Sequence, residues 1–277
     1  MASHTPGEWV LPAALAPHRE RLLATERPIV RLLPQYDDTS PQASLLDSRI
    51  GGVPYLPEGL AYPTNHKYEP LQLLCQLDLS TLPPVLPLPE RGLLQFFIDP
   101  WSFLYGMQLG KDDKMGHEVR YFAEPTAARP VEEVRLKMPD FGAAAYVGPM
   151  EAAVAAQGIP VTFEAAQQLA GSSDAHFSRR LGEDFWEQLP DDDFKTREAY
   201  DRSNFDNGHH LGGYATFTQG DPRYTQSGDL TYHLLQLDSD DRLGLMWGDM
   251  GIAHFFISRK ALEAGQFEKA TFYWDCY

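Results

Sequence analysis

Acidic residues gather in the segment DSDDRLGLMWGD at positions 238–249. Acids stand at its first, third and twelfth positions, which is the spacing at which a calcium loop places carboxylate ligands. Such a loop also needs Asp or Asn at its fifth position and Gly at its sixth. Those positions hold Arg242 and Leu243, so the segment does not predict a metal site.

Four histidines, His209, His210, His233 and His254, lie in the same part of the chain. If the fold brings them together, they could bind a metal or exchange protons near neutral pH. Their spacing contains no pair of ligands with an acid, so we interpret them as packing and surface residues. The sequence also lacks the nucleophile elbow, the P-loop and the dinucleotide fingerprint. It therefore names no catalytic residue and no cofactor.

A binding surface is the remaining hypothesis for these segments, together with QGDPR at 219–223. Packing alone does not require Trp247, Gly248 and Asp249 together at a strand connection, and Trp supplies a large amphipathic surface. We expect these loops to face acidic residues of the N-terminal half. The alternative is that Trp247 fills the junction between halves while Asp249 caps a turn. The candidate binding residues are Gln219, Asp221, Arg223, Gln236, Asp238, Asp240, Trp247, Asp249, Glu58 and Glu90.

Two stretches of the chain resemble each other at a nearly constant spacing. Gly51-Gly52 and Gly212-Gly213 are 161 positions apart, LCQLD at 74 and LLQLD at 234 are 160 apart, and GLLQFFI at 92 and GIAHFFI at 251 are 159 apart. This spacing predicts an internal duplication. It places Gln76 and Asp78 opposite Gln236 and Asp238, where polar side chains either hold turn backbone or line a shared groove.

Each copy contains short apolar runs bounded by Gly, Pro and Asp, which is typical of strands. We expect strands at 71–79, 93–99 and 118–124, and at 231–239, 252–258 and 269–275. Helices are predicted at 12–26, 162–171, 174–189 and 258–267, and the acidic run 190–194 is predicted to be an exposed loop.

The predicted fold class is α+β, with two related, mostly antiparallel or mixed β units packed together and helices at the periphery. We expect one compact domain over 1–277. It comprises a helical arm at 1–27, a first repeat at about 28–124, a helical connector at about 125–205 and a second repeat at about 206–277.

Composition limits the partners. The chain has 277 residues and a net charge of −16, which argues against nucleic acid and anionic membranes and favours attraction of a basic partner. Cys75 and Cys276 are too few for a disulfide framework, and we expect both to be free thiols. The N-terminus lacks the pattern of a signal peptide, and no apolar run is long enough to cross a bilayer. We expect a cytoplasmic protein.

The segments IGGVPYLP (50–57), LLQLDSDD (234–241) and MWGDMGIAHFFIS (246–258) resemble the YwqG-like family, a domain of unknown function. The resemblance covers roughly residues 45–277. Ala215 departs from it, since a proline is expected after Gly212-Gly213-Tyr214. The resemblance implies a cytosolic bacterial protein with an internally duplicated α+β fold, and it implies no activity.

Three classes of function remain open. The first is a non-catalytic binding protein, for example an immunity- or inhibitor-like protein whose acidic surface binds a protein partner. The alternative is a small-ligand-binding protein or enzyme with its site between the two repeats. The third is a structural or assembly role.

Overall fold

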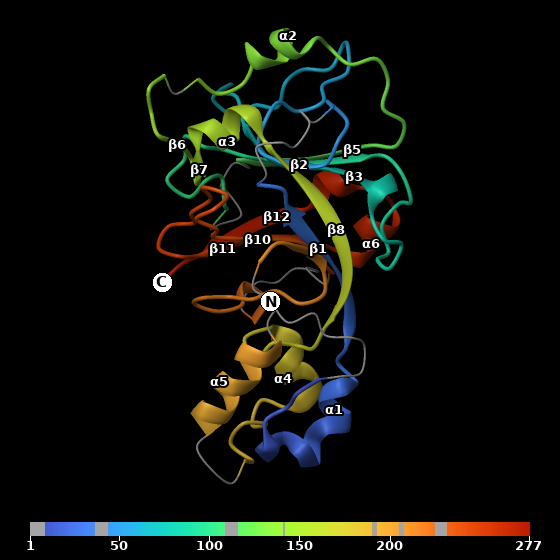
Figure 1. Ribbon diagram of the computed structural model, residues 1–277, viewed down its shortest axis with the longest axis vertical. Coiled ribbons are helices and arrows are strands. Elements are labelled where there is room, and N and C mark those ends of the chain that lie inside the picture. The colour runs from blue at the N-terminus through green and yellow to red at the C-terminus, as the bar shows by residue number, and fades with distance from the viewer. Residues whose placement is uncertain are drawn as a thin grey trace.

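A ten-stranded sheet forms the body of the protein (Figure 1). The computed structural model describes residues 9–36, 44–108, 116–140, 142–189, 193–204, 208–224 and 232–277. The strand order is β12-β11-β10-β9-β1-β8-β2-β3-β4-β5, and every pairing in it is antiparallel. The strands are β1 (Arg27–Pro34), β2 (Arg49–Ile50), β3 (Gln72–Asp78), β4 (Leu93–Ile98), β5 (His117–Phe122), β8 (Ile159–Gln168), β9 (His210–Gly212), β10 (Tyr232–Asp238), β11 (Ile252–Ile257) and β12 (Thr271–Asp275). A separate hairpin joins β6 (Tyr146–Val147) to β7 (Met150–Glu151).

Short helices surround the sheet. The α-helices are α1 (Arg19–Leu23), α2 (Val131–Arg135), α3 (Ala152–Gln157), α4 (Ala175–Leu181), α5 (Asp193–Asn204) and α6 (Arg259–Glu263). The 3-10 turns are η1 (Ala13–His18), η2 (Leu79–Thr81), η3 (Pro222–Tyr224) and η4 (Phe267–Lys269). Together with the sheet they confirm a mixed helix and strand fold built mostly on an antiparallel sheet. In the described part of the chain, no helix has the length and apolar composition that crossing a membrane requires.

The two ends of the sheet, β2–β5 (the first half) and β9–β12 (the second half), pair in the same register. In the first half, Gln76 lies opposite Gln95, and a bulge separates Leu73 from Cys75. In the second half, Gln236 lies opposite His254, and a bulge separates the residues at 233 and 235. Each Gln thus occupies the same position of an equivalent hairpin.

The sheet curls so that these two halves pack against each other. Phe96 on β4 and Phe255 on β11 lie with their ring centres 4.9 Å apart. All six residues of β4 and all six of β11 are buried. Both faces of these strands are therefore covered, which explains why their sequences, LLQFFI and IAHFFI, are mostly apolar rather than alternating.

The two central strands are exchanged between the halves. β1 precedes the first half in sequence but pairs with β9 of the second half. β8 precedes the second half but pairs with β2 of the first half, and β1 and β8 pair with each other. The long β8 runs lengthwise from the α3 region to the α4 region (Figure 1). The exchange joins the halves into one continuous sheet.

The predicted helix at 162–171 is wrong, because this segment belongs to β8. The segment contains good helix formers, Glu164, Ala165 and Ala166, and for this reason its local sequence predicts a helix. β1 presents N–H and C=O groups along its whole length, and β8 pairs with all eight of its residues. Pairing these N–H and C=O groups stabilises the protein more than the local preference of the segment for a helix does. The connector 125–205 is accordingly not all helical.

The helix predicted at 174–189 is shorter than expected. Asp174 caps α4 by accepting a hydrogen bond from the backbone of His176, and α4 ends at Leu181. Gly182, at a φ of 95°, turns the chain there. Beyond it, Phe185 still packs into the same aromatic cluster, which explains the helical spacing in the sequence. The run 190–194 lies mostly outside the described residues, and α5 begins at 193.

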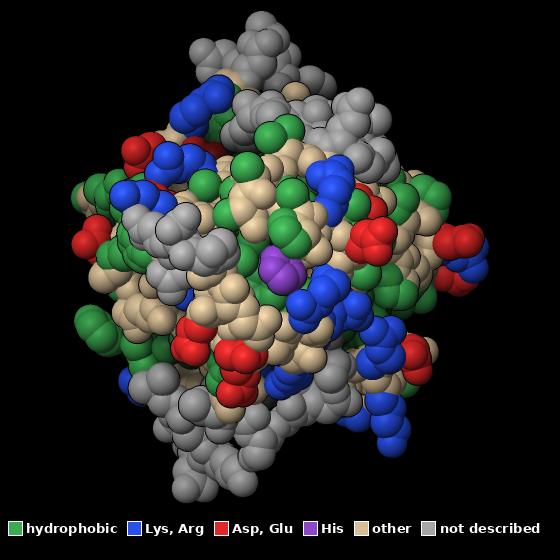
Figure 2. Space-filling model, turned by 90° about the horizontal axis from the view of Figure 1, so that it is seen from below, with side chains coloured by type: hydrophobic (Ala, Val, Ile, Leu, Met, Phe, Trp, Pro, Cys, Tyr) green, Lys and Arg blue, Asp and Glu red, His purple; other side chains and the backbone are tan. Residues whose placement is uncertain are grey.

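A helical lobe caps one end of the molecule, where α1, α4 and α5 lie together (Figure 1). Its core is an aromatic cluster in which Phe177 stacks on Trp186, with ring centres 5.2 Å apart. Seen from this end, Lys and Arg side chains lie beside Asp and Glu side chains (Figure 2). This face therefore carries mixed charge, although the whole chain is strongly acidic.

Candidate functional site

The charges of the QGDPR segment are buried in an ion cluster. The Nη2 atom of Arg223 lies 2.6 Å from a carboxylate oxygen of Asp221 and 2.6 Å from one of Asp174. Backbone N–H groups complete the pairing, from Ala175 to Asp221 and from Ala215 to Asp174. The cluster links the N-terminus of α4 to the second half of the sheet. These charges stabilise the fold and are not open to a partner.

Ala215 has a specific role in this cluster. Its backbone N–H donates to Oδ2 of Asp174 over 3.1 Å. A proline, which the resemblance to YwqG-like proteins predicts at 215, has no N–H and could not make this bond. Although burial raises the pKa of Asp174, the hydrogen bond from His176 and the charge of Arg223 hold it well below its usual range. Alanine at 215 therefore provides a backbone N–H that stabilises the buried carboxylate of Asp174.

Three of the four histidines converge in the interior. The ring centres of His210 and His233 are 5.3 Å apart, as are those of His233 and His254. His233 Nδ1 lies 3.1 Å from the carbonyl oxygen of Gly212, which can only accept, so Nδ1 is the protonated nitrogen. His254 Nδ1 then donates to His233 Nε2 over 3.2 Å. Burial lowers the pKa of His233 and His254 well below the usual value, so both are neutral.

The convergence does not make a metal site in the described part of the chain, where no group of three or more His, Cys, Asp or Glu side chains is placed to hold an ion. His209 lies apart from the other three, with Nε2 3.5 Å from Asp240. The hydrogen bonds from His209 and Tyr36 hold the pKa of Asp240 well below its usual range, while burial opposes them. Burial raises the pKa of neighbouring Asp238 to about 6.

The two matched glutamines hold turn backbone. Gln236 Oε1 accepts from the N–H of Thr216, and its Nε2 donates to the carbonyl of Gly208. Gln76 makes the same pair of bonds, to Tyr55 N–H and the carbonyl of Asp47. Both side chains are fully buried, so they cannot line an open groove.

Trp247 is also fully buried, and it packs against the first half of the molecule. Its ring lies 5.8 Å from that of Tyr105, centre to centre, and 6.3 Å from that of Trp274. Tyr105 belongs to the connection between β4 and β5. The structure thus places Trp247 at the contact between the halves, as the alternative interpretation expects, and not on the surface.

The remaining candidates are exposed and separate. Gln219 donates from Nε2 to the carbonyl of Cys276, and Asp249 accepts from Tyr277 N–H through its backbone oxygen. The side chains of Asp249, Glu58 and Glu90 make no hydrogen bond or ion pair with another described residue. The structure does not bring the ten candidates together into one site.

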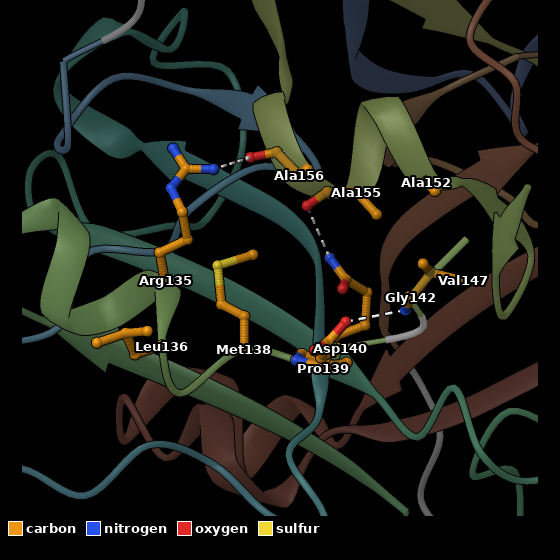
Figure 3. Close-up of a pocket in the computed structure, with 11 residues that line it drawn as sticks. Arg135, Leu136, Met138, Pro139, Asp140, Gly142, Val147, Ala152, Ala155 and Ala156 are labelled. Atoms are coloured by element: carbon orange, nitrogen blue, oxygen red, sulfur yellow. Dashed lines mark hydrogen bonds between the residues drawn. The ribbon is translucent and has the colours of Figure 1, made fainter. Parts of the chain in front are cut away.

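One cavity of about 370 Å³ lies between α2 and α3 (Figure 3). Buried Gln72, charged Arg135 and Asp140, and apolar Met138 and Val147 are among the residues that line it. Much of its polar chemistry is internal: Arg135 donates to the carbonyl of Ala156, and the Asp140 carboxylate accepts from the N–H of Gly142 (Figure 3).

A larger hollow of about 580 Å³ lies between two loops of the first half, 63–70 and 99–107. We call it the aromatic hollow. Its walls combine aromatic and charged side chains. They include His66, Lys67, Glu69, Asp99, Trp101 and Phe103.

Exposed aromatic side chains surround the aromatic hollow. Tyr68 and Phe103 are 88% and 92% exposed, and Trp101 is 42% exposed. Tyr68 also adopts a φ of 64°, which is uncommon for a residue other than glycine. Side chains of this size usually contribute to the core, so their exposure on adjacent loops marks a candidate contact surface.

Buried polar groups fix the two loops to each other. The Nδ2 atom of Asn65 donates to Oε2 of Glu69 over 2.7 Å and to Oδ2 of Asp99 over 3.0 Å. Oδ1 of Asn65 accepts from the N–H groups of Lys67 and Glu69. Nε1 of Trp101 donates to the carbonyl of Pro70. These bonds fix the backbone of the two loops that carry the exposed side chains of Tyr68, Trp101 and Phe103.

The second half supports the same loop from beneath. Nε1 of Trp274 donates to the carbonyl of Leu104 over 2.9 Å, and Tyr105 packs on Trp247 and Trp274. At the loop's base, a Cβ on Gly106 would lie 1.8 Å from the carbonyl oxygen of Gly116, so this close approach requires glycine. Trp247 therefore positions a first-half surface.

Sequence reasoning did not select the aromatic hollow. A signal was present, because WSFLYG at 101–106 places three aromatic residues in six positions directly after an apolar strand and Pro100. What the sequence did not show is that 63–70 lies beside this run, since the two loops are joined by bonds between distant residues, from Asn65 to Asp99 and from Trp101 to the carbonyl of Pro70.

Comparison with known proteins gives one match. The model of a family described as "Domain of unknown function (DUF1963)" matches residues 48–276. A search of curated proteins gave no match. The match spans both halves of the sheet and the loops of the aromatic hollow.

Proposed function

The chain belongs to the DUF1963 family, whose description carries no activity, and on that premise we propose that it is a non-catalytic binding protein that docks a protein partner at the aromatic hollow. An immunity- or inhibitor-like protein is one form of this function. The observation that carries the proposal is Phe103, 92% exposed on a loop that hydrogen bonds and ring contacts fix from both sides.

Rigid, exposed aromatic side chains are the usual anchors of protein interfaces. Trp and Tyr dominate interface energetics, because they bury a large area and lose little conformational entropy on binding. The net charge of −16 favours a basic partner, since opposite charge speeds association. The two free thiols support a reducing compartment, and we propose the bacterial cytoplasm, in keeping with the resemblance to YwqG-like proteins.

We also propose that the two halves arose by internal duplication. The supporting observations are contacts that recur 159–161 positions apart. Asp78 N–H donates to the side chain of Ser48, and Asp238 N–H donates to that of His209. Leu79 N–H donates to the carbonyl of Gly92, and Ser239 N–H donates to that of Gly251.

Affinity capture followed by titration tests the binding function. A partner captured from a native cell extract is purified and titrated against the wild type and against Phe103→Ala and Tyr68→Ala by calorimetry. Because both side chains are exposed, the variants should melt at the wild-type temperature. We expect Phe103→Ala to weaken binding about tenfold or more, the effect of losing a hot-spot residue.

Asp249→Asn is the matched control, since Asp249 is exposed on the second half. If Asp249→Asn abolishes binding while both aromatic variants keep the wild-type Kd, the partner docks on the second-half loops and the aromatic hollow is not the site. Equal Kd values for the wild type and all three variants would show that the partner binds neither the aromatic hollow nor the second-half loops.

Small-ligand binding is the second candidate, favoured by the cavity between α2 and α3. Gln72 is buried in its wall, and Arg135 and Asp140 offer opposite charges (Figure 3). A small-molecule screen by thermal shift tests it, with Ala155→Leu as the variant that fills the cavity. A compound that shifts the melting temperature of the wild type and of Ala155→Leu equally would not bind there.

A further inference from the structure

We infer that the aromatic hollow accepts the guanidinium group of an arginine side chain from the partner protein. This inference rests on the proposed function and adds the chemistry of the residue that enters the hollow. At about 580 Å³, the hollow lies within the usual range of ligand sites, about 300–1,000 Å³.

A buried carboxylate forms part of its wall. Asp99 is 5% exposed, and its Oδ1 accepts a hydrogen bond from the N–H of Trp101. Its Oδ2 shares the Asn65 amide with Glu69, so one nitrogen bridges two carboxylates. Within the described residues, neither acid forms an ion pair with a Lys, Arg or His side chain.

Two adjacent carboxylates that no cation of the described residues pairs with create a site for a cation. Buried charges in proteins are usually paired, because an unpaired charge loses its hydration without compensation. The bonds from Asn65 and from Trp101 N–H come from neutral donors. Among the described residues no cation is paired with Asp99 or Glu69, so a positive group of the partner can neutralise them.

The aromatic walls select an organic cation. Trp101 and Phe103 line the same hollow, and aromatic faces attract guanidinium and ammonium groups. A guanidinium group also stacks on an aromatic ring and donates in a planar fork to two carboxylate oxygens, which an ammonium group does not. Arginine therefore fits the combination of two acids and an aromatic wall better than lysine.

A metal ion fits this site less well than arginine. Hard cations take six or more oxygen ligands, whereas here two carboxylates are already engaged with Asn65. No group of three or more His, Cys, Asp or Glu side chains is placed to hold a metal in the part of the chain that the structure describes.

Lys67 opposes the incoming charge. Its side chain lines the hollow and makes no ion pair with a described acid. The amine would repel a guanidinium group, so its removal should strengthen binding. His66 lies beside it in the same wall.

A short peptide tests the inference directly. Acetyl-Gly-Arg-Gly-amide is titrated into isotope-labelled full-length protein, and the Trp101 indole N–H resonance is followed by NMR. The matched probe is the same peptide with citrulline, which keeps the shape of arginine and lacks its charge. We expect saturable shifts with the arginine peptide, at least about tenfold weaker binding of the citrulline peptide, and intermediate binding of the lysine peptide.

Variants distinguish specific binding at the hollow from a general attraction to the acidic protein. Asp99→Asn and Glu69→Gln should each weaken arginine binding about tenfold, and Lys67→Ala should tighten it. Glu58→Gln, an exposed acid of the same half, should keep the wild-type affinity. Since Asp99 is buried, Glu69→Gln and Lys67→Ala carry the test if Asp99→Asn fails to fold.

The two proposals fail separately. If Phe103→Ala loses the captured partner but the arginine and citrulline peptides bind equally or not at all, the surface docks a partner and the arginine inference is wrong. If the arginine peptide binds as expected but Phe103→Ala binds the captured partner with the wild-type Kd, the hollow binds arginine and the proposed docking function is wrong. Equal loss with Glu58→Gln would reduce the effect to net charge and overturn the inference.

Discussion

Gln76 and Gln236 hold equivalent turns: Gln76 Oε1 accepts from the N–H of Tyr55, and Gln236 Oε1 accepts from the N–H of Thr216. Each amide also donates to a carbonyl of the segment that precedes its Gly-Gly pair, at Asp47 and at Gly208. Gln76 makes two further bonds, from Gln95 and to Leu45. The same side chain thus closes the same loop in both halves.

Replacing either glutamine by leucine should destabilise the protein, and Gln76→Leu should cost more. Each substitution leaves buried N–H and C=O groups without a hydrogen-bond partner, which lowers the free energy of unfolding by about 1–3 kcal/mol for each unpaired group. Urea unfolding followed by circular dichroism measures the difference. Gln266→Leu, at an exposed position, is the control and should change the free energy of unfolding by less than about 0.5 kcal/mol. Equal stability of Gln76→Leu and the control would refute the structural role.

The buried histidines should make the protein sensitive to acid. The pKa values of His233 and His254 are held well below the ordinary value by burial, with the charge of Arg223 and neighbouring histidines acting in the same direction. Below pH about 6.5 the unfolded chain takes up protons that the folded protein cannot bind. Stability therefore falls as pH drops through this range, by up to about 1.4 kcal/mol per group and pH unit.

Asp238 acts in the opposite direction. Burial raises its folded pKa to about 6, so the folded protein binds a proton there before the unfolded chain does, and this gain grows as pH falls from 7 towards 4. The first half shows how to isolate the histidines, since Leu73 and Gln95 occupy their positions. In His233→Leu/His254→Gln, stability should fall less between pH 7 and 5 than in the wild type. Exposed His66→Gln should keep the wild-type slope. An unchanged slope in the double variant would contradict the assignment.

Removing Arg223 should be among the most damaging single substitutions. Arg223→Met leaves Asp174 and Asp221 buried without their cation, at a cost of about 3–5 kcal/mol. The shift of the urea midpoint measures it, against Arg179→Met at an exposed position. Ala215→Pro should also destabilise, because it removes the N–H that Asp174 accepts. If Ala215→Pro stabilises the protein, the role assigned to the Ala215 N–H is wrong.

The two thiols should differ in reactivity. Cys75 is fully buried, and burial raises its pKa far above the ordinary value, whereas Cys276 is partly exposed. Titration with a thiol reagent should therefore find one reactive group in the folded protein and two after unfolding without reductant. Two thiols reacting at equal rates in the folded state would show that Cys75 is accessible.

Sequence pattern alone located most of the sheet. The largely apolar runs of β3, β4, β10 and β11 are correctly predicted to be strands, since a strand covered on both faces has more apolar residues than an alternating one. The matched spacing also placed Gln76 and Gln236 correctly relative to each other, because the Gly-Gly pair and the paired strands lie close in sequence within each half.

Only the tertiary structure decided where β8 lies and where the exposed aromatic side chains gather. The segment 162–171 has residues typical of a helix, and it is a strand because β1, over a hundred residues earlier, offers it a full row of backbone partners. Likewise, the sequence left open whether Trp247 belongs to a binding surface or fills the junction between the halves, and its burial against Tyr105 decided for the junction. The aromatic hollow also depends on tertiary contacts, because the bonds from Asn65 to Asp99 and from Trp101 to the carbonyl of Pro70 join its two loops. Local sequence encodes periodicity and turns, while contacts between distant segments depend on how the whole chain packs.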